Sequence, residues 1–197
     1  SGSTQEISEF VANELVGLGV RVELHPCRAV KQLEEYSAVV AGAPLYMFHL
    51  HKDMTHFFQR HQRSLAARPV AVFAGGPYGP NFETDVVEVQ KNLTAELAKF
   101  TWFHPVSIQL VGGRFDPARL HFPYNLIPAL KQASASDARN WEEIRAWTHE
   151  LPGLLLARHP GCADLETLDV RGQKACVEDF EHGPPEAPRK IIAAAHG

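Results

Sequence analysis

Three short predicted strands, two of them almost fully apolar and each followed at once by a glycine-containing turn, constrain the fold of this 197-residue chain most strongly. Apolar runs without polar alternation are typical of parallel strands that are covered on both faces. Segments with apolar residues at 3.6-residue spacing separate these runs and indicate helices. The apolar runs are residues 37–42 and 70–74, and residues 105–111 are predicted as the last strand. The helical patterns are residues 4–18, 50–65, 84–99 and 137–156. Alternation of this kind predicts the α/β class with a parallel sheet.

The helical patterns also predict which side chains face the core. Residues 20–24 alternate in polarity and indicate a further strand, which Pro26 is expected to end. Asp137 is the expected N-cap of the last helix. The side chains expected to face inward are Ile7, Phe10, Val11, Leu15 and Leu18, then Met54, Phe57, Phe58 and Leu65, then Val87, Leu93 and Leu97, and finally Trp141, Ile144 and Trp147.

The chain opens with a glycine and small hydroxyl side chains directly before the first helical pattern. Glycine permits a tight turn, while the hydroxyls and the free N–H groups of the first helical turn point toward an anion. The helix dipole adds a partial positive charge, so the segment suits a bound phosphate. An ordinary N-cap is the competing interpretation. The residues concerned are Ser1, Gly2, Ser3, Thr4, Gln5 and Glu6.

Ligands of open parallel sheets bind beyond the carboxyl ends of the strands. We therefore expect the turns at residues 43–48, 75–80 and 112–116 to share one rim with the opening turn. Tyr46, Phe48 and Tyr78 offer aromatic faces for a flat ligand there, with burial under a loop as the alternative for each.

These four segments together resemble the flavodoxin family, and more specifically its branch of flavodoxin-type protoporphyrinogen oxidases. The matching segments are residues 2–7, 42–46, 75–77 and 112–116. The resemblance implies a three-layer sandwich with a five-stranded parallel sheet over about residues 1–156. It also implies FMN, with its phosphate on the first turn and its ring between the next two loops. The cofactor-binding residues so implied are Ser1, Gly2, Ser3, Thr4, Gln5, Glu6, Pro44, Leu45, Tyr46, Met47, Gly75, Gly76, Pro77, Tyr78, Gly79, Gly113 and Asp116.

The chain departs from the family at its start, because no strand precedes Ser1. Loss of a central strand would remove several buried apolar side chains and cost roughly 10 kcal/mol of folding free energy. That cost is comparable to the stability of a whole domain. Residues 188–197 have the form of that strand, and we expect them to fill the central position of the sheet. The alternatives are upstream residues outside this sequence and, since alanine favours helices, a short surface helix. Residues 157–187, which mix proline, glycine and charge, are expected to form a peripheral extension or linker.

Composition excludes several classes of function. The net charge of −4 argues against a nucleic-acid reader, and no apolar run is long enough to span a bilayer. Three dispersed cysteines without a CxxC motif suggest a reducing compartment, the cytoplasm, and no zinc ribbon. We interpret His49, His51, His56 and His61 as solvated helix residues, and no metal site is expected.

The sequence thus favours an FMN-binding redox protein, either an electron carrier or an oxidoreductase, with no catalytic side chain assigned. Its partner would be a redox protein or a small-molecule acceptor such as a quinone, and the resemblance implies protoporphyrinogen as a substrate. A flavodoxin-like interaction module without cofactor is the alternative, which the unusual start of the chain favours. A receiver domain is discounted, because Gly42, Ala43 and Pro44 stand where the phospho-accepting aspartate belongs. Whether the chain forms a homo-oligomer stays open.

Overall fold

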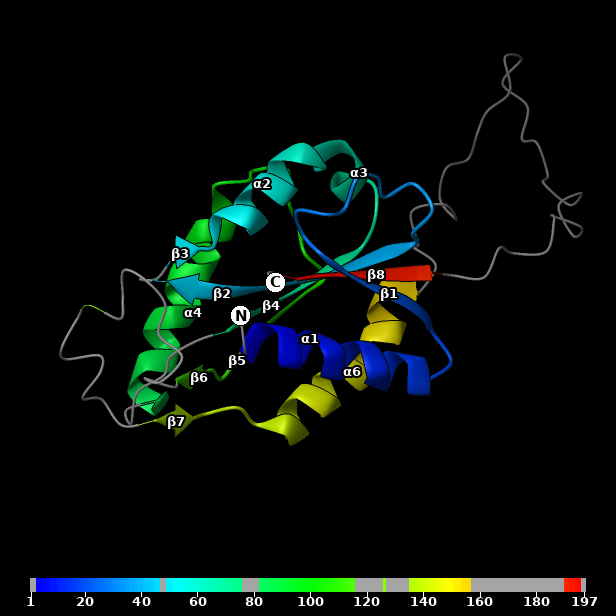
Figure 1. Cartoon of the computed structure of the whole chain (residues 1–197). Coiled ribbons are helices and arrows are strands. Elements are labelled where there is room, and N and C mark those ends of the chain that lie inside the picture. The colour runs from blue at the N-terminus through cyan, green and yellow to red at the C-terminus, as the bar shows by residue number, and fades with distance from the viewer. Residues whose placement is uncertain are drawn as a thin grey trace, which may run out of the picture.

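The computed structural model describes residues 3–46, 49–75, 82–115, 126, 135–156 and 190–195. Its centre is a sheet of five parallel strands in the order β1-β8-β2-β4-β5 (Figure 1). A short strand, β3, pairs antiparallel with the end of β2 and makes the sheet six-stranded. The bounds are β1 (Arg21–Pro26), β2 (Ala38–Tyr46), β3 (His49–Leu50), β4 (Val70–Gly75), β5 (Ser107–Val111) and β8 (Lys190–Ala195). The predicted α/β class with a five-stranded parallel sheet is confirmed.

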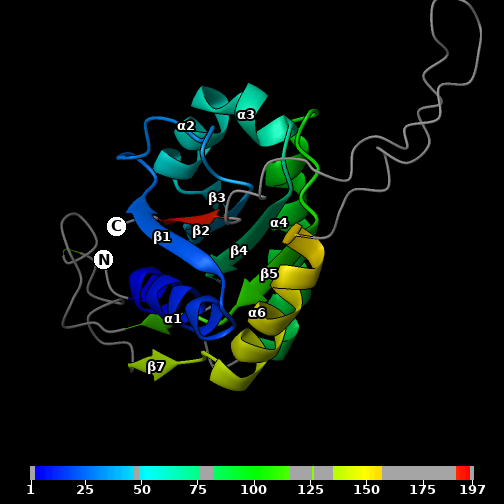
Figure 2. The ribbon, with the colours of Figure 1, turned by 90° about the vertical axis from the view of Figure 1, so that its right-hand side faces the viewer.

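Helices cover both faces of the sheet and complete a three-layer sandwich (Figure 2). One face carries α1 (Ser3–Gly17) and α6 (Trp141–Leu156), whose apolar residues form one core cluster with the sheet. The other face carries α2 (Lys52–Arg60), α3 (Gln62–Ala66) and α4 (Phe82–Ala98), which form the second cluster. Neighbouring residues of β2 alternate between the two clusters, as the pleat of a strand requires.

The C-terminal segment occupies the central position predicted for it. β8 lies between β1 and β2 and is parallel to both, with Ile191 opposite Val22 on one side and Ala38 on the other. Ile191 and Ile192 are 0% and 1% exposed, one in each core cluster. Burying two isoleucine side chains contributes about 3–6 kcal/mol, so β8 is a major part of the core.

Lys190 anchors the beginning of this strand. Its Nζ lies 2.7 Å from Glu23 Oε1 of β1 and 3.0 Å from Glu35 Oε2, and it sits over the Tyr36 ring. The Tyr36 hydroxyl donates a hydrogen bond to Glu23 Oε2. The hydrogen bond from Lys190, followed by that from Tyr36, lowers the pKa of Glu23 to about 2. These contacts fix the register of β8 against β1.

Several local predictions differ from the structure. β1 includes Pro26, which is tolerated because β1 is an edge strand. The predicted loop at 43–48 is partly strand, because β2 continues to Tyr46 and turns back into β3. The predicted helix at 50–65 is two helices, α2 and α3, interrupted at His61. Val87 is 74% exposed rather than inward-facing.

Candidate functional site

The carboxyl ends of the central strands and the start of α1 meet at one rim of the sheet. Strand register places Gly42 opposite Ala195 and Pro44 opposite Gly75. A Cβ atom added to Gly75 would lie 3.7 Å from Pro44 Cα and 3.8 Å from Thr4 Oγ1. Three segments that the sequence implicated separately, at Thr4, Pro44 and Gly75, are therefore neighbours in space.

Thr4 brings a hydroxyl to this meeting point. The residue is only 3% exposed, and its hydroxyl makes no hydrogen bond within the described part of the chain. Ser8, one turn later, donates its hydroxyl to the Thr4 carbonyl at 2.7 Å and so is not available to a ligand. The Thr4 hydroxyl oxygen is not among the fully buried atoms without a hydrogen-bond partner in the described structure, so it is open to a ligand. The Thr4 hydroxyl thus fits a site for an acceptor such as a phosphate oxygen.

Ser3 and Gln5 flank Thr4 in the first turn of α1. The first N–H groups of a helix have no acceptor inside it, so this turn offers backbone donors to an anion. The Gln5 side chain is exposed and donates to Glu9 Oε1 at 2.9 Å.

Glu6 also lies in the first turn of α1, and its negative charge is neutralised. Its carboxylate forms an ion pair with Arg139, whose side chain is 6% exposed, and Arg114 Nη1 lies 3.9 Å away. Arg139 also contacts Asp137, with Nη2 2.6 Å from Oδ2, and the hydrogen bonds from Arg139 lower the pKa of Asp137. Both guanidinium groups offset the negative charge of Glu6, so Glu6 opposes an anion at the start of α1 less strongly.

The same network ties the turn after β5 to α1. Strands β6 (Arg114–Phe115) and β7 (Ser136–Asp137) pair with each other, and the Ala138 N–H donates to the Gly113 carbonyl at 3.0 Å. A Cβ atom on Gly112 would lie 1.7 Å from the Ala138 carbonyl oxygen, so only glycine permits this approach. Gly113, a predicted site residue, is buried beside this contact.

Two histidines near the end of β2 were not predicted as site residues. His49 pairs with Tyr46 in the β2–β3 ladder, and its Nδ1 lies 2.9 Å from Glu96 Oε1 of α4. His51 is the N-cap of α2 and accepts a hydrogen bond from the Asp53 N–H, while burial lowers its pKa. The Leu45 side chain packs into the core cluster beneath this loop.

The remaining predicted site residues lie outside the described part of the chain, and so does residue 48, one of the aromatic candidates. Those site residues are Ser1, Gly2, Met47, Gly76, Pro77, Tyr78, Gly79 and Asp116. For Tyr46 the structure describes the backbone alone. Within the described ranges no group of three or more histidine, cysteine or acidic side chains could hold a metal ion. No helix in those ranges is long and apolar enough to cross a membrane.

Comparisons with known proteins identify the family of the chain. A family model described as a flavodoxin domain matches residues 1–127. Curated relatives include the protoporphyrinogen IX dehydrogenases [quinone] of Escherichia coli K12 and of E. coli O6:H1. Each is 31% identical over 75 residues, which is 37% of this chain and 41% of the relative. The aligned region thus spans less than half the length of these relatives. No solved structure matches the chain significantly.

The matched region includes α1, β1, β2, β4 and β5, and therefore all the described rim residues except Ala195. The family match covers well over half of the chain, and the parallel sheet with helices on both faces agrees with it. The chain belongs to the flavodoxin family.

Proposed function

We propose that this chain is an FMN-binding flavodoxin-like redox protein. The observation that carries the proposal is the Thr4 hydroxyl, nearly buried and without a partner, beside Pro44 and Gly75 at the carboxyl ends of the strands. A hydroxyl free to donate at this place suits an acceptor, and a phosphate supplies one. When bound, FMN supplies the redox chemistry by accepting and releasing electrons.

The chain's own residues bind and orient the cofactor in this proposal. Ser3, Thr4 and Gln5, with the N–H groups of their turn, hold the phosphate. Arg139 and Arg114 remove the repulsion that Glu6 would otherwise exert on it. Pro44 and Gly75 bring two loops against the isoalloxazine ring of FMN. The other predicted residues complete the site, and they are Ser1, Gly2, Met47, residues 76–79, Gly113 and Asp116.

The electron acceptor belongs to the same proposal. The relatives' names include a quinone and protoporphyrinogen IX. We propose that the chain passes electrons from a reduced donor, a redox protein or a small molecule such as a protoporphyrinogen, to a quinone-type acceptor. Residues 1–156 and 188–197 form the cofactor domain in this proposal, and residues 157–187 are a peripheral extension. A cytoplasmic location fits Cys27, a buried free thiol whose pKa burial raises to about 12.

A visible spectrum of the purified chain tests the proposal, recorded before and after addition of FMN and removal of the excess. We expect the yellow absorbance band of a bound flavin, at about one FMN per chain. Bleaching of that band by a reductant, and its return on addition of a quinone, would support the redox role. A folded chain that stays colourless and takes up no FMN would leave the cofactor-free interaction module as the better description.

A further inference from the structure

The two short strands β6 and β7 bring a nearly buried arginine to the first turn of α1. Arg139 follows β7, and its side chain is 6% exposed. Its guanidinium group forms an ion pair with Glu6 on one side, and its Nη2 lies 2.6 Å from Asp137 Oδ2 on the other. Its Cζ lies over the Trp141 ring, 4.8 Å from the centroid. Arg139 is thus held between two carboxylates and an aromatic face.

Arg139 keeps its charge in this position. The hydrogen bond with Asp137 is the main reason that the pKa of Arg139 rises, the hydrogen bond with Glu6 adds to the rise, and burial opposes it. A buried charge is costly unless it is paired and hydrogen-bonded. Separation of Arg139 from Glu6 would therefore leave the guanidinium group with one carboxylate and Glu6 with a weaker partner.

Glu6 matters for an anion because of its place in α1. It lies in the first turn, where free backbone N–H groups attract an anion and a carboxylate repels it. Arg139 donates a hydrogen bond to Glu6 Oε2, whereas Arg114 Nη1 lies 3.9 Å from Oε1, beyond hydrogen-bond distance, on a side chain that is 37% exposed. Solvent and salt screen an exposed charge more than a buried one. Arg139 is therefore the main group that offsets the charge of Glu6.

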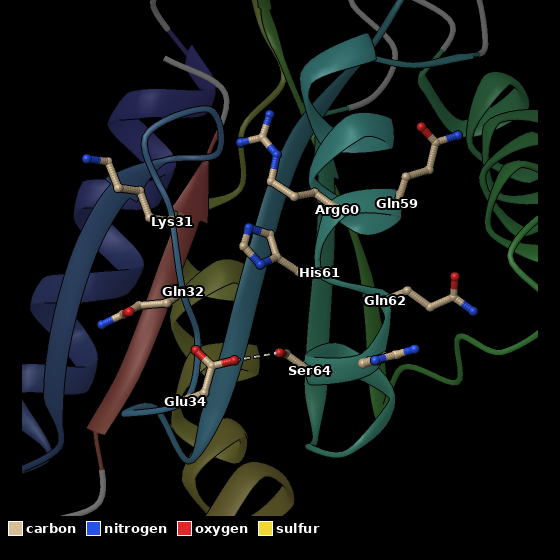
Figure 3. A pocket seen from close by; sticks show the side chains of 9 residues that line it. Lys31, Gln32, Glu34, Gln59, Arg60, His61, Gln62 and Ser64 are labelled. Atoms are coloured by element: carbon tan, nitrogen blue, oxygen red, sulfur yellow. Dashed lines mark hydrogen bonds between the residues drawn. The ribbon is translucent and has the colours of Figure 1, made fainter.

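This cluster differs from another group of positive side chains in the described structure. Lys31 and Arg60 line a hollow between the β1–β2 connection and the junction of α2 and α3, and their charged ends point in different directions (Figure 3). Arg139 and Arg114 instead approach one carboxylate, that of Glu6. The charge at the start of α1 therefore depends on a defined contact between two parts of the chain.

We infer that Arg139 is a positioning residue that couples the β6–β7 pair to the proposed phosphate site. The inference rests on the proposed function, since it concerns the same site. While the β6–β7 pair is docked on α1, Arg139 offsets the charge of Glu6, and the first turn of α1 attracts the phosphate. When the pair moves away, Arg114 of β6 leaves with it, and Glu6 repels the phosphate. Because coupling is reciprocal, the pair should open less often when FMN is bound.

Fluorescence titration of the full chain with FMN tests the coupling in three variants. Arg139→Gln should bind FMN about five- to tenfold more weakly, because Glu6 keeps its charge and loses its main partner. Glu6→Gln should bind FMN about two- to fivefold more tightly, because both guanidinium groups then act without an opposing carboxylate. The double variant should return to within about twofold of the parent. A purely structural role of Arg139 predicts no such recovery, since the double variant still lacks the contacts with Asp137 and Trp141.

Arg145→Gln is the matched control. Arg145 of α6 also contacts a carboxylate of α1, with Nε 3.2 Å from Glu14 Oε1, and it also lies over an aromatic ring, that of Phe10. Glu14 lies about 12 Å further along α1 than Glu6. The control removes the same kind of contact between the same two parts of the chain, and its FMN affinity should stay within about twofold of the parent.

Hydrogen exchange measured by NMR tests the reciprocal effect. The Ala138 N–H donates to the Gly113 carbonyl at 3.0 Å, so its exchange reports opening of the β6–β7 pair. Saturating FMN should slow this exchange in the parent by about five- to tenfold, the factor by which docking raises the affinity. In Arg139→Gln the slowing should be less than about twofold.

Several results would overturn the inference and leave the proposed function intact. They are equal FMN affinity in Arg139→Gln and the parent, weakening that persists in the double variant, and equal slowing of the Ala138 exchange in Arg139→Gln and the parent. If Arg139→Gln does not fold, Glu6→Gln decides, and unchanged FMN affinity in that variant would overturn the inference. A parent chain that takes up no FMN would overturn the proposed function and this inference together.

Discussion

Removal of one hydroxyl group at the start of α1 should weaken FMN binding without weakening the fold. The substitution is Thr4→Val, which preserves the shape of the side chain and replaces the hydroxyl with a methyl group. Thr4 is nearly buried, and its hydroxyl has no hydrogen-bond partner in the described structure. The chain without FMN therefore loses no internal hydrogen bond, and its unfolding midpoint should stay the same or rise.

The expected loss in affinity follows from the charge of the ligand. A hydrogen bond to a charged group contributes about 1.5–3 kcal/mol. Its removal should raise the dissociation constant of FMN by about 10- to 150-fold. Because FMN would bind the folded chain alone, the thermal stabilisation that it provides at a fixed concentration should fall accordingly.

Two measurements separate binding from stability. Titration of the flavin-free chain with FMN, followed by flavin fluorescence, gives the dissociation constant, and thermal unfolding with and without FMN gives the stability. Thr148→Val is the matched control, because Thr148 is also buried but donates its hydroxyl to the Ile144 carbonyl within α6. The control should lose stability and keep its affinity. Equal FMN affinity in Thr4→Val and the parent would refute the assignment of Thr4 to the phosphate.

Three further predictions concern the fold. Ile191→Ala should lower the free energy of unfolding, measured with urea, by about 2–5 kcal/mol, because it leaves a cavity at a fully buried position of β8. The control Val87→Ala, on the exposed surface of α4, should change that free energy by about 0.5 kcal/mol or less. Gly112→Ala should lower stability by about 1–3 kcal/mol, measured by thermal unfolding, since its Cβ would overlap a backbone carbonyl; an unchanged midpoint would contradict the close approach. The hydrogen bond from Lys190 is the main reason that the pKa of Glu23 falls to about 2, below its value in the unfolded chain. The stability that Glu23 adds to the folded chain is therefore present above about pH 4 and is lost as the pH falls toward 2. Glu23→Gln should therefore flatten the acid limb of a stability–pH profile, and an unaltered limb would show that the ion pair adds nothing.

Sequence patterns predicted the buried strands well, because burial on both faces leaves a nearly continuous apolar run. Residues 70–74 and 37–42 were assigned correctly on that ground and form β4 and the beginning of β2. The sequence patterns also predicted the amphipathic helices, but they did not predict every side chain that faces the core. Val87 was expected inward, yet Val89 is the buried residue, since it continues the i, i+4 stripe of Leu93 and Leu97 while Val87 lies nearly on the opposite side of the helix.

A contact between distant segments accounts for one error, and a choice between neighbouring cap residues accounts for another. His61 was expected in solvent but is buried, because the Val30 carbonyl from the β1–β2 connection accepts from it. Asp137 was the expected cap of α6, but it bonds Arg139, and Asn140 Oδ1 accepts from the Glu143 N–H instead. Only the partner of His61 is distant in sequence, because Asn140 stands at the ordinary N-cap spacing from Glu143.

The neutralisation of Glu6 was likewise beyond local reasoning. Its partner Arg139 follows it by more than a hundred positions and reaches it only because the β6–β7 pair folds back onto α1. Sequence alone predicted an anion-binding turn at the start of the chain, whereas the structure shows the guanidinium groups that offset the charge of Glu6.

Sequence alone determined the layered α/β architecture and the order of rim segments, since both follow from periodicity and turn chemistry along the chain. The fate of residues 190–195 illustrates the limit, because their alanine-rich composition also suits a helix. These residues form a strand in the tertiary structure, because β1 and β2 provide backbone hydrogen-bond partners on its two sides and helices provide apolar contacts on both faces of the sheet. The free energy gained from hydrogen bonding and burial on both sides of the strand exceeds the helix propensity of alanine, which differs from that of other residues by only a few tenths of a kcal/mol per residue.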